Sequence, residues 1–192
     1  MLDPSTIRGE VIADLLEQLD QCGLEVNLFW CPTDIGVPMF TCYVLDRRPG
    51  AGAYEGHGCH LDPEIAMVRA VTEAVQARTI FIAGARDDLM RSTYAVLKRT
   101  RLTRHDFEQQ SVVVAWDDLP DRDTGTFHGD VRVMLDALAA AGFERVLARE
   151  LDAREFEVAV ARVIVPGLEP YLFSWSAYGD RALRFDASAY LP

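Results

Sequence analysis

Residues 56–88 combine a short glycine-containing segment with a long apolar stretch that has the period of a helix. Asp62 and Pro63 open the apolar stretch, and these residue types are favoured at a helix N-cap and at the first helical position. We therefore predict a helix over residues 63–83. Apolar residues cover most of its circumference, which is typical of a helix that is buried on several sides.

One narrow stripe of this helix is polar. At about 100° per residue, Asp62, Arg69, Glu73 and Gln76 fall within an arc of roughly 60°. An acid on a buried helix requires a partner or a ligand, because a desolvated charge is costly. Two interpretations are open. Arg69 and Glu73 form an ordinary i,i+4 ion pair at a surface, or the carboxylate of Glu73 holds Mg²⁺ or the polar edge of a nucleotide, with Gln76 one turn further on.

The residues before this helix are expected to form a loop over residues 47–60, because they are rich in glycine and basic residues. In such a loop, Gly56 and Gly58 would present free backbone N–H groups to an anion, together with the start of the helix. The His-Gly-Cys-His sequence at residues 57–60 also suggests metal ligands, but its members lie too close in sequence to complete a tetrahedral site. We favour a loop with packed side chains over a metal site.

The rest of the chain shows helix and strand patterns without an internal repeat. We predict strands over residues 24–31, 37–46, 146–150 and 157–165, and helices over residues 5–21, 89–101 and 130–141. The first two strands are expected to pair antiparallel, because only a short turn separates them. The element order does not follow βαβ units. We therefore predict an α+β fold, with an antiparallel or mixed sheet packed against helices, in a single domain over residues 1–192.

Charge and composition restrict the class of partner. The 192 residues carry a formal net charge of −11, which disfavours nucleic acid and anionic membranes, because Lys and Arg supply the affinity for phosphates. No apolar run reaches the roughly 18 residues that a membrane span requires, and the N-terminus lacks the pattern of a secretory signal. We expect a cytoplasmic protein with no nucleic-acid or membrane partner, and with Cys31, Cys42 and Cys59 as free thiols in the core.

Residues 56–78 follow the pattern Gly-x-Gly-Cys-His-x-Asp-Pro-Glu-x-Ala-x-x-Arg-Ala-x-Thr-Glu-Ala-x-Gln-x-Arg, and residues 82–88 read Ile-Ala-Gly-Ala-Arg-Asp-Asp. Both stretches resemble the second half of the YcaO-like proteins. The segments at residues 23–38 and 160–169 agree with this resemblance, so it covers nearly the whole chain. It is strongest to the branch that works with a TfuA-type partner protein.

The resemblance implies an ATP-dependent reaction on the backbone of a peptide. The amide oxygen is phosphorylated and leaves after a nucleophile has attacked the carbonyl carbon. A side-chain nucleophile gives an azoline, whereas external sulfide gives a thioamide, the product associated with TfuA partners. Because phosphate is a good leaving group, the work left to the protein is positioning and charge stabilisation.

The resemblance also implies which residues bind the cofactors, ATP and Mg²⁺, while no catalytic residue is assigned. The implied ATP-binding residues are Glu73, Gln76, Arg69, His60 and Arg78, and the implied Mg²⁺ ligands are Glu73 and Glu64. Ile65 stands where the family usually has an acid, and Ala77 separates Gln76 from Arg78, which on an ideal helix faces away from Glu73.

Members of the family are longer than this chain, and their nucleotide site also draws residues from an N-terminal half. The chain is therefore expected to be part of an ATP-dependent enzyme that activates peptide amides. The alternative is a non-catalytic half-domain that binds a partner or a peptide. The expected partners are a peptide substrate and either a TfuA-like protein or the missing N-terminal half, and a homodimer is also compatible with the sequence.

Overall fold

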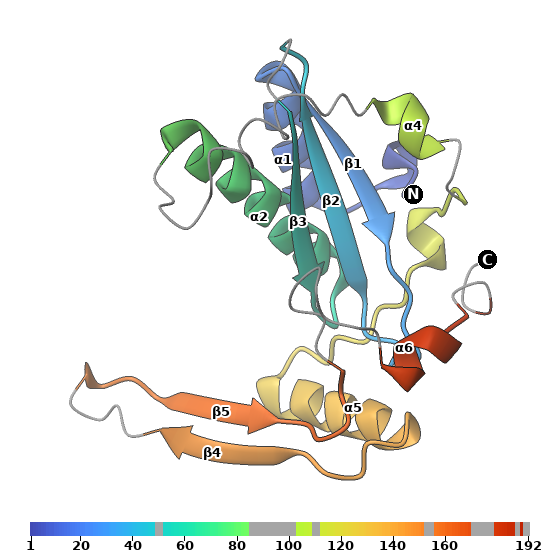
Figure 1. Ribbon diagram of the computed structural model, residues 1–192, viewed down its shortest axis with the longest axis vertical. Coiled ribbons are helices and arrows are strands. Elements are labelled where there is room, and N and C mark those ends of the chain that lie inside the picture. Colours follow the sequence, from blue (N-terminus) through green and yellow to red (C-terminus); the bar gives the residue numbers. More distant parts are fainter. Residues whose placement is uncertain are drawn as a thin grey trace. The chain divides into compact units, whose positions relative to one another are not determined.

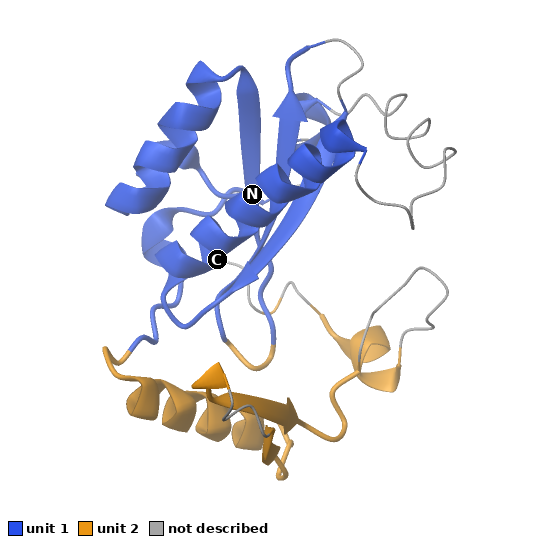
Figure 2. Ribbon diagram, turned by 90° about the vertical axis from the view of Figure 1, so that its left-hand side faces the viewer, with its two compact units in different colours: residues 1–33, 37–123, 190–192 blue, residues 34–36, 124–189 orange. Residues whose placement is uncertain are grey.

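The computed structural model describes residues 1–48, 52–84, 103–108, 112–151, 156–169, 179–186 and 189. The chain divides into two compact units, which Figure 2 shows in different colours. Unit 1 contains residues 1–33, 37–123 and 190–192, and unit 2 contains residues 34–36 and 124–189. The single domain over residues 1–192 stays a prediction.

Unit 1 is built on a three-stranded antiparallel sheet with the strand order β1-β2-β3. The strands are β1 (Leu24–Trp30), β2 (Met39–Asp46) and β3 (Ala53–Cys59). Val26 of β1 lies opposite Val44 of β2, and Cys42 of β2 lies opposite Gly56 of β3. The antiparallel pairing predicted for the first two strands is confirmed, and so is the α+β class.

Two helices, α1 (Glu10–Gln21) and α2 (Pro63–Ala83), cover one face of this sheet (Figure 1). α2 packs mainly on β3 and β2, and α1 packs on β1. The apolar core lies between the helices and the sheet. Its buried members include Ile12, Leu19, Leu24, Leu28, Phe40, Cys42, Val44, Ala66, Met67, Ala70, Val71 and Ala74.

The predicted bounds of α2 are confirmed, because strong local signals mark both ends. The Asp62 carboxylate accepts a hydrogen bond from the backbone N–H of Glu64 at 2.7 Å, which caps the first turn. At the other end Gly84 adopts a φ of 61°, the left-handed conformation in which helices commonly stop. α2 buries one face, while Ile65 and Ile82 are exposed, so the prediction of burial on several sides is wrong.

β3 replaces most of the loop that was predicted over residues 47–60. Along this strand Tyr54, Gly56 and Gly58 are buried, and the residues between them are exposed. The loop prediction is wrong because two of the three inward positions are glycine, which hides the alternation of apolar and polar residues by which a strand is recognised. The two glycines therefore do not form an anion-binding loop.

Gly56 and Gly58 instead allow α2 to lie directly on the backbone of β3. A Cβ atom on Gly58 would lie 1.9 Å from the carbonyl oxygen of Ala66, and one on Gly56 would lie 2.2 Å from the backbone nitrogen of Ala74. Atoms this close overlap, so only glycine permits this spacing between strand and helix.

The N-terminal segment is fixed along the other edge of the sheet. Leu2 donates its N–H to the carbonyl oxygen of Leu28 at 2.8 Å and forms a parallel bridge with Val114. Pro4–Thr6 form a short 3-10 turn, so the helix predicted over residues 5–21 begins at Glu10. Unit 1 also contains α4 (Arg104–Glu108). The helix predicted over residues 89–101 lies outside the described residues.

Unit 2 contains α5 (Phe127–Ala140), β4 (Leu147–Leu151), β5 (Val160–Ile164) and α6 (Asp180–Arg184). β4 and β5 form an antiparallel pair in which Arg149 lies directly opposite Arg162. α5 and both strands were predicted with somewhat different ends, and α6 was not. Among the described residues of both units, no helix is long and apolar enough to cross a membrane.

Candidate functional site

The polar stripe of α2, formed by Arg69, Glu73 and Gln76, lies beside the edge of β3. The guanidinium Nη1 of Arg69 donates to the carbonyl oxygen of Cys59 at 2.8 Å. One turn further on, Oε2 of Glu73 accepts a hydrogen bond from the backbone N–H of His57 at 2.7 Å. Each side chain thus binds a backbone group on the free edge of β3, the edge that does not pair with β2. The i,i+4 ion pair that was considered for these two residues does not form in the described structure.

The stripe also faces outward. Arg69, Glu73 and Gln76 are all exposed. Within the described structure the Glu73 carboxylate uses only Oε2, so Oε1 remains available to a ligand. The hydrogen bond from His57 fixes the direction of a side chain that would otherwise rotate freely, which reduces the entropy that ligand binding would cost. The structure therefore brings together three of the predicted site residues on the exposed side of α2, and hydrogen bonds hold two of them, Arg69 and Glu73.

Glu64 has a different environment, at the first turn of α1. Its Oε1 accepts the backbone N–H groups of Val11 and Ile12 at 2.8 and 3.1 Å. Gly9, the N-cap residue of α1, has no side chain to fulfil this role, and a Cβ on Gly9 would lie 2.5 Å from Cδ of Glu64. Glu64 thus caps α1 from a neighbouring helix, and Gly9 leaves the space that it needs.

Glu64 and Glu73 are far apart on α2. At 1.5 Å per residue they are separated by roughly 13 Å along the helix axis, which is too far for both carboxylates to bind one Mg²⁺ ion. Over the part of the chain that the structure describes, no three His, Cys, Asp or Glu side chains are placed to hold a metal ion together.

Arg78 lies on another side of α2 and binds Asp46. Its Nε and Nη2 lie 3.1 and 2.8 Å from Oδ2 of Asp46, whose side chain is 1% exposed. Arg48 donates to the same carboxylate. Hydrogen bonds from Arg48 and Arg78 hold the pKa of the Asp46 carboxyl well below its usual range. Arg78 therefore joins α2 to the end of β2.

His60 supports the turn that leads into α2. The ring Nδ1 of His60 accepts a hydrogen bond from the backbone N–H of Asp62 at 3.0 Å. The backbone N–H of His60 donates to the carbonyl oxygen of Pro38 at 3.1 Å. These bonds place Asp62 for its capping role.

Sequence reasoning missed a row of polar side chains on the other face of the sheet. Thr41 of β2 lies between Cys31 and His57, within hydrogen-bonding distance of both. Glu55 lies on the same face, because alternate residues of β3 point to opposite sides. The row could have been found from the exposed alternation of residues 55, 57 and 59, had β3 been recognised as a strand.

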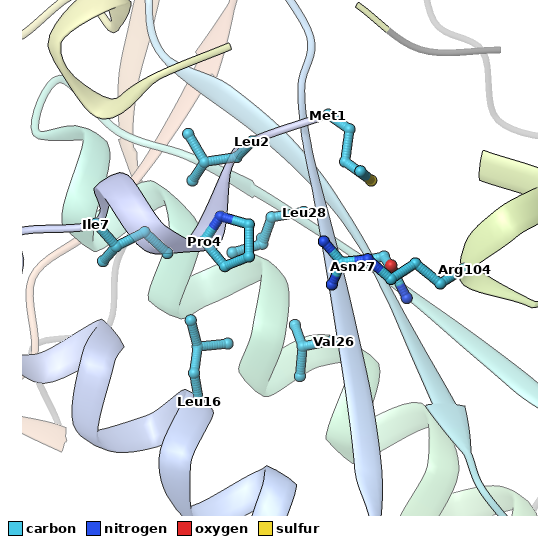
Figure 3. A pocket seen from close by; sticks show the side chains of 9 residues that line it. All are labelled: Met1, Leu2, Pro4, Ile7, Leu16, Val26, Asn27, Leu28 and Arg104. Carbon is cyan, nitrogen blue, oxygen red and sulfur yellow. The ribbon is translucent and has the colours of Figure 1, made fainter. Parts of the chain in front are cut away.

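A small pocket lies at the β1 edge of unit 1 (Figure 3). It is lined by Met1, Leu2, Pro4, Ile7, Leu16, Val26, Asn27, Leu28 and Arg104. Asn27 is buried there, and its Oδ1 has no hydrogen-bond partner in the described structure. The pocket lies beside β1 and the polar stripe of α2 lies beside β3. Because β2 separates these two strands, the pocket and the stripe are separate sites.

Comparison with known proteins identifies the family. The model of the YcaO cyclodehydratase family, described as ATP- and Mg²⁺-binding, matches residues 1–169. This chain belongs to the YcaO family. The predicted family is therefore confirmed, while its TfuA-associated branch stays a prediction.

The YcaO chain is similar to longer curated proteins. An uncharacterized protein of Methanothermobacter thermautotrophicus is 36% identical over 94% of this chain and 48% of its own length. An uncharacterized protein from the tfuA 3′ region of Rhizobium leguminosarum bv. trifolii is 32% identical over 88% of this chain and 42% of its own length. The chain thus spans about half the length, or less, of these relatives.

Solved heterocyclase structures share the fold. A heterocyclase in complex with substrate and cofactor matches 88% of this chain with a TM-score of 0.70 and 22% identity. The heterocyclase TruD matches 88% with a TM-score of 0.65 and 23% identity. This chain covers 23% and 24% of those two structures.

Proposed function

We propose that this YcaO-family chain forms one wall of the Mg²⁺·ATP site of an enzyme that activates peptide-backbone amides. The observation that carries the proposal is the exposed Glu73 carboxylate, fixed by the His57 N–H on the same stripe as Arg69 and Gln76. The family description as an ATP- and Mg²⁺-binding cyclodehydratase supports this assignment.

The chemistry of the stripe fits the cofactors. Mg²⁺ prefers oxygen ligands, keeps several waters and is commonly held by one or two carboxylates together with substrate phosphates. Glu73 supplies a carboxylate, Gln76 an amide oxygen, and Arg69 a guanidinium that would neutralise phosphate charge. We assign the remaining protein ligands to the additional length that the relatives have.

The cofactor contacts that were predicted for Glu64, His60 and Arg78 stay predictions, and the proposed site does not use these residues as ligands. The described contacts give each of them a structural role: Glu64 caps α1, His60 supports the turn before α2, and Arg78 binds Asp46. In the proposed site they would therefore act by positioning α2 and its stripe, because every one of these contacts fixes an end or a side of that helix.

When bound, ATP supplies the phosphoryl group that makes the amide oxygen a leaving group. The chain's own contribution is to orient Mg²⁺·ATP against the stripe and to balance its charge. We further propose a thioamide product and a TfuA-type partner, and the Rhizobium relative from a tfuA region supports that choice. Mass spectrometry of a modified peptide distinguishes the two products, because a thioamide replaces oxygen by sulfur whereas an azoline loses water.

The alternative function is a half-domain that binds a partner or a peptide without catalysis. It is favoured by exposed apolar side chains of unit 2, among them Leu147 and Ile164, which lie opposite each other across β4 and β5. A surface of this kind commonly marks a contact with another polypeptide.

Calorimetric titration with Mg²⁺·ATP tests the proposal. The chain is titrated alone, and then in complex with a polypeptide that corresponds to the unmatched part of the Methanothermobacter relative, after size-exclusion chromatography has verified the complex. We expect no measurable binding by the chain alone and clear binding by the complex. An assembled complex that does not bind Mg²⁺·ATP would contradict the nucleotide function and favour the half-domain alternative.

A further inference from the structure

Cys31, Thr41 and His57 form a continuous polar row across the sheet face that points away from α1 and α2. Sγ of Cys31 lies 3.4 Å from Oγ1 of Thr41, and this oxygen lies 3.1 Å from Nδ1 of His57. On the far side of the imidazole, Nε2 lies 3.8 Å from Oε1 of Glu55. The row thus contains a nucleophile, a hydroxyl that can relay a proton, a base and an acid that faces the base.

We propose that Cys31 is a reactive thiol, activated by proton transfer through Thr41 to His57, that exchanges sulfur with small disulfides and persulfides. The Thr41 hydroxyl accepts the thiol proton as it donates its own proton to Nδ1 of His57. The products are a thiolate, still held by the Thr41 hydroxyl, and an imidazolium whose charge the carboxylate of Glu55 stabilises. A nucleophile, a base and a group that orients the base are the components of an activated thiol.

The exchange step is balanced without an external oxidant. The Cys31 thiolate attacks one sulfur of a disulfide R–S–S–R, a Cys31–S–S–R bond forms, and R–S⁻ leaves. The imidazolium of His57 returns its proton to the leaving thiolate and becomes neutral again. With a persulfide R–S–SH, attack on the outer sulfur leaves a persulfide on Cys31.

The other cysteines provide an internal comparison. Cys22, at the end of α1, and Cys59 are exposed, and Cys31 is partly exposed, so the prediction of core thiols is correct only for Cys42. Cys42 is buried, and burial raises the pKa of its thiol to about 12. Desolvation also raises the pKa of the Cys59 thiol. Exposure alone would make Cys22 and Cys59 more reactive than Cys31, whereas the row makes Cys31 the most reactive thiol. The order in which the cysteines are labelled therefore distinguishes the two explanations.

Other groups lie near the row. Sγ of Cys31 also lies 3.6 Å from the carbonyl oxygen of Phe29, a second acceptor for the thiol proton, and the relay operates when the thiol proton points to Thr41 instead. The Tyr43 hydroxyl donates to Oε1 of Glu55 at 2.7 Å, and the amino group of Met1 interacts electrostatically with Cys31. All variants therefore keep Tyr43 and the same N-terminus, so that only the relay changes. The proposal does not rest on nucleotide binding, although β3 carries both the His57 imidazole and the N–H that fixes Glu73.

The experiment treats the folded chain with less than one equivalent of an aromatic disulfide that releases a coloured thiolate, and mass spectrometry locates the label. We expect Cys31 to react about tenfold faster than Cys22, as an activated thiol should. Thr41→Val and His57→Asn should lower the Cys31 rate to that of Cys22, whereas Thr41→Ser retains the relay and should react like the wild type.

Cys42 reports on folding in the same experiment, because it becomes labelled only if the core opens. With Cys42 unlabelled, faster reaction of Cys22 than of Cys31 in the wild type would overturn the proposal. An unchanged Cys31 rate in both Thr41→Val and His57→Asn would overturn it as well. If Thr41→Val opens the core, His57→Asn alone decides, since an asparagine oxygen can accept the Thr41 hydrogen bond but cannot take up the proton.

Discussion

Arg78 and Asp46 form an ion pair that joins α2 to the end of β2, with Nη2 2.8 Å from Oδ2. The Asp46 side chain is 1% exposed and the Arg78 side chain 19% exposed, so solvent screens this pair little. Replacing Arg78 leaves a buried carboxylate with only Arg48 to balance it. The pair therefore determines how firmly the C-terminal half of the helix that carries the stripe is held.

Arg78→Met is expected to lower the free energy of unfolding by about 1–3 kcal/mol, because one hydrogen-bonded partner of a buried charge is lost. Arg47→Met is the matched control. Arg47 pairs with Asp20 at the surface, where both side chains are more than half exposed, and such pairs contribute less than about 1 kcal/mol. Urea denaturation measures both changes, and equal losses would contradict the special role of Arg78.

The pair also makes stability depend on pH. Hydrogen bonds from Arg48 and Arg78 lower the folded-state pKa of Asp46, so its contribution to stability is fully present above the unfolded pKa, near 3.9 for an isolated Asp. That contribution is lost as the pH falls toward the lower folded pKa. Asp46→Asn should therefore lose less stability than the wild type between about pH 5 and pH 3. Parallel denaturation curves for the two proteins over this range would contradict the account.

The two inward glycines of β3 should tolerate no larger residue. Gly58→Ala places a methyl group 1.9 Å from the Ala66 oxygen, so we expect a loss of about 3 kcal/mol or more, at or above the upper range for overpacked cores. Gly23→Ala is the control, because its Cβ meets no atom within 4 Å and its φ of 74° adds only backbone strain, about 1 kcal/mol. Thermal unfolding compares them, and a mild effect at Gly58 would mean that α2 lies further from β3.

Glu64 should behave as the cap of α1. Glu64→Ala removes the acceptor for the Val11 and Ile12 N–H groups, at a cost of about 1 kcal/mol. Glu64→Gln keeps a carbonyl oxygen and should lose clearly less. The rates of hydrogen exchange at the Val11 and Ile12 amides measure this capping directly. Equal acceleration of exchange in both variants would show that the side-chain oxygen at position 64 does not cap α1.

In unit 2, Arg149 and Arg162 face each other across β4 and β5. Like charges directly opposite in an antiparallel pair are destabilising, and an opposite-charge pair contributes about 0.2–1 kcal/mol. Arg149→Glu should therefore slow hydrogen exchange of the β4 and β5 amides, whereas Arg149→Lys should leave it unchanged. Faster exchange in Arg149→Glu would contradict the pairing.

The sequence was most informative where structure depends on local signals. Asp62, Pro63 and Gly84 mark the ends of α2 without reference to the rest of the chain, so both ends were predictable. Position on one helix face follows from the 3.6-residue period, so the shared stripe of Arg69 and Glu73 was predictable too. The identity of the family followed from the same segment, because its motif is dense in polar residues at fixed spacing.

The contacts of these residues were not predictable, because they involve other elements. Glu73 binds the His57 N–H only because β3 is a strand whose edge lies beside α2, and Gly56 and Gly58 concealed that strand. Glu64 was expected to be a metal ligand because the family resemblance implies an acid at this part of the helix. Its role as a cap depends on α1, which lies far from it in sequence.

The most direct test of the proposed ATP site compares the affinity for Mg²⁺·ATP of the assembled complex that contains Glu73→Gln with that of the wild-type complex. Glutamine retains an oxygen for the His57 N–H, so the stripe keeps its geometry while the charge is lost. Glu17→Gln, on the exposed side of α1, is the control for net charge. The account predicts at least about tenfold weaker binding for Glu73→Gln, or about 1.4 kcal/mol, and no change for Glu17→Gln. Equal affinities of Glu73→Gln and the wild type would contradict it.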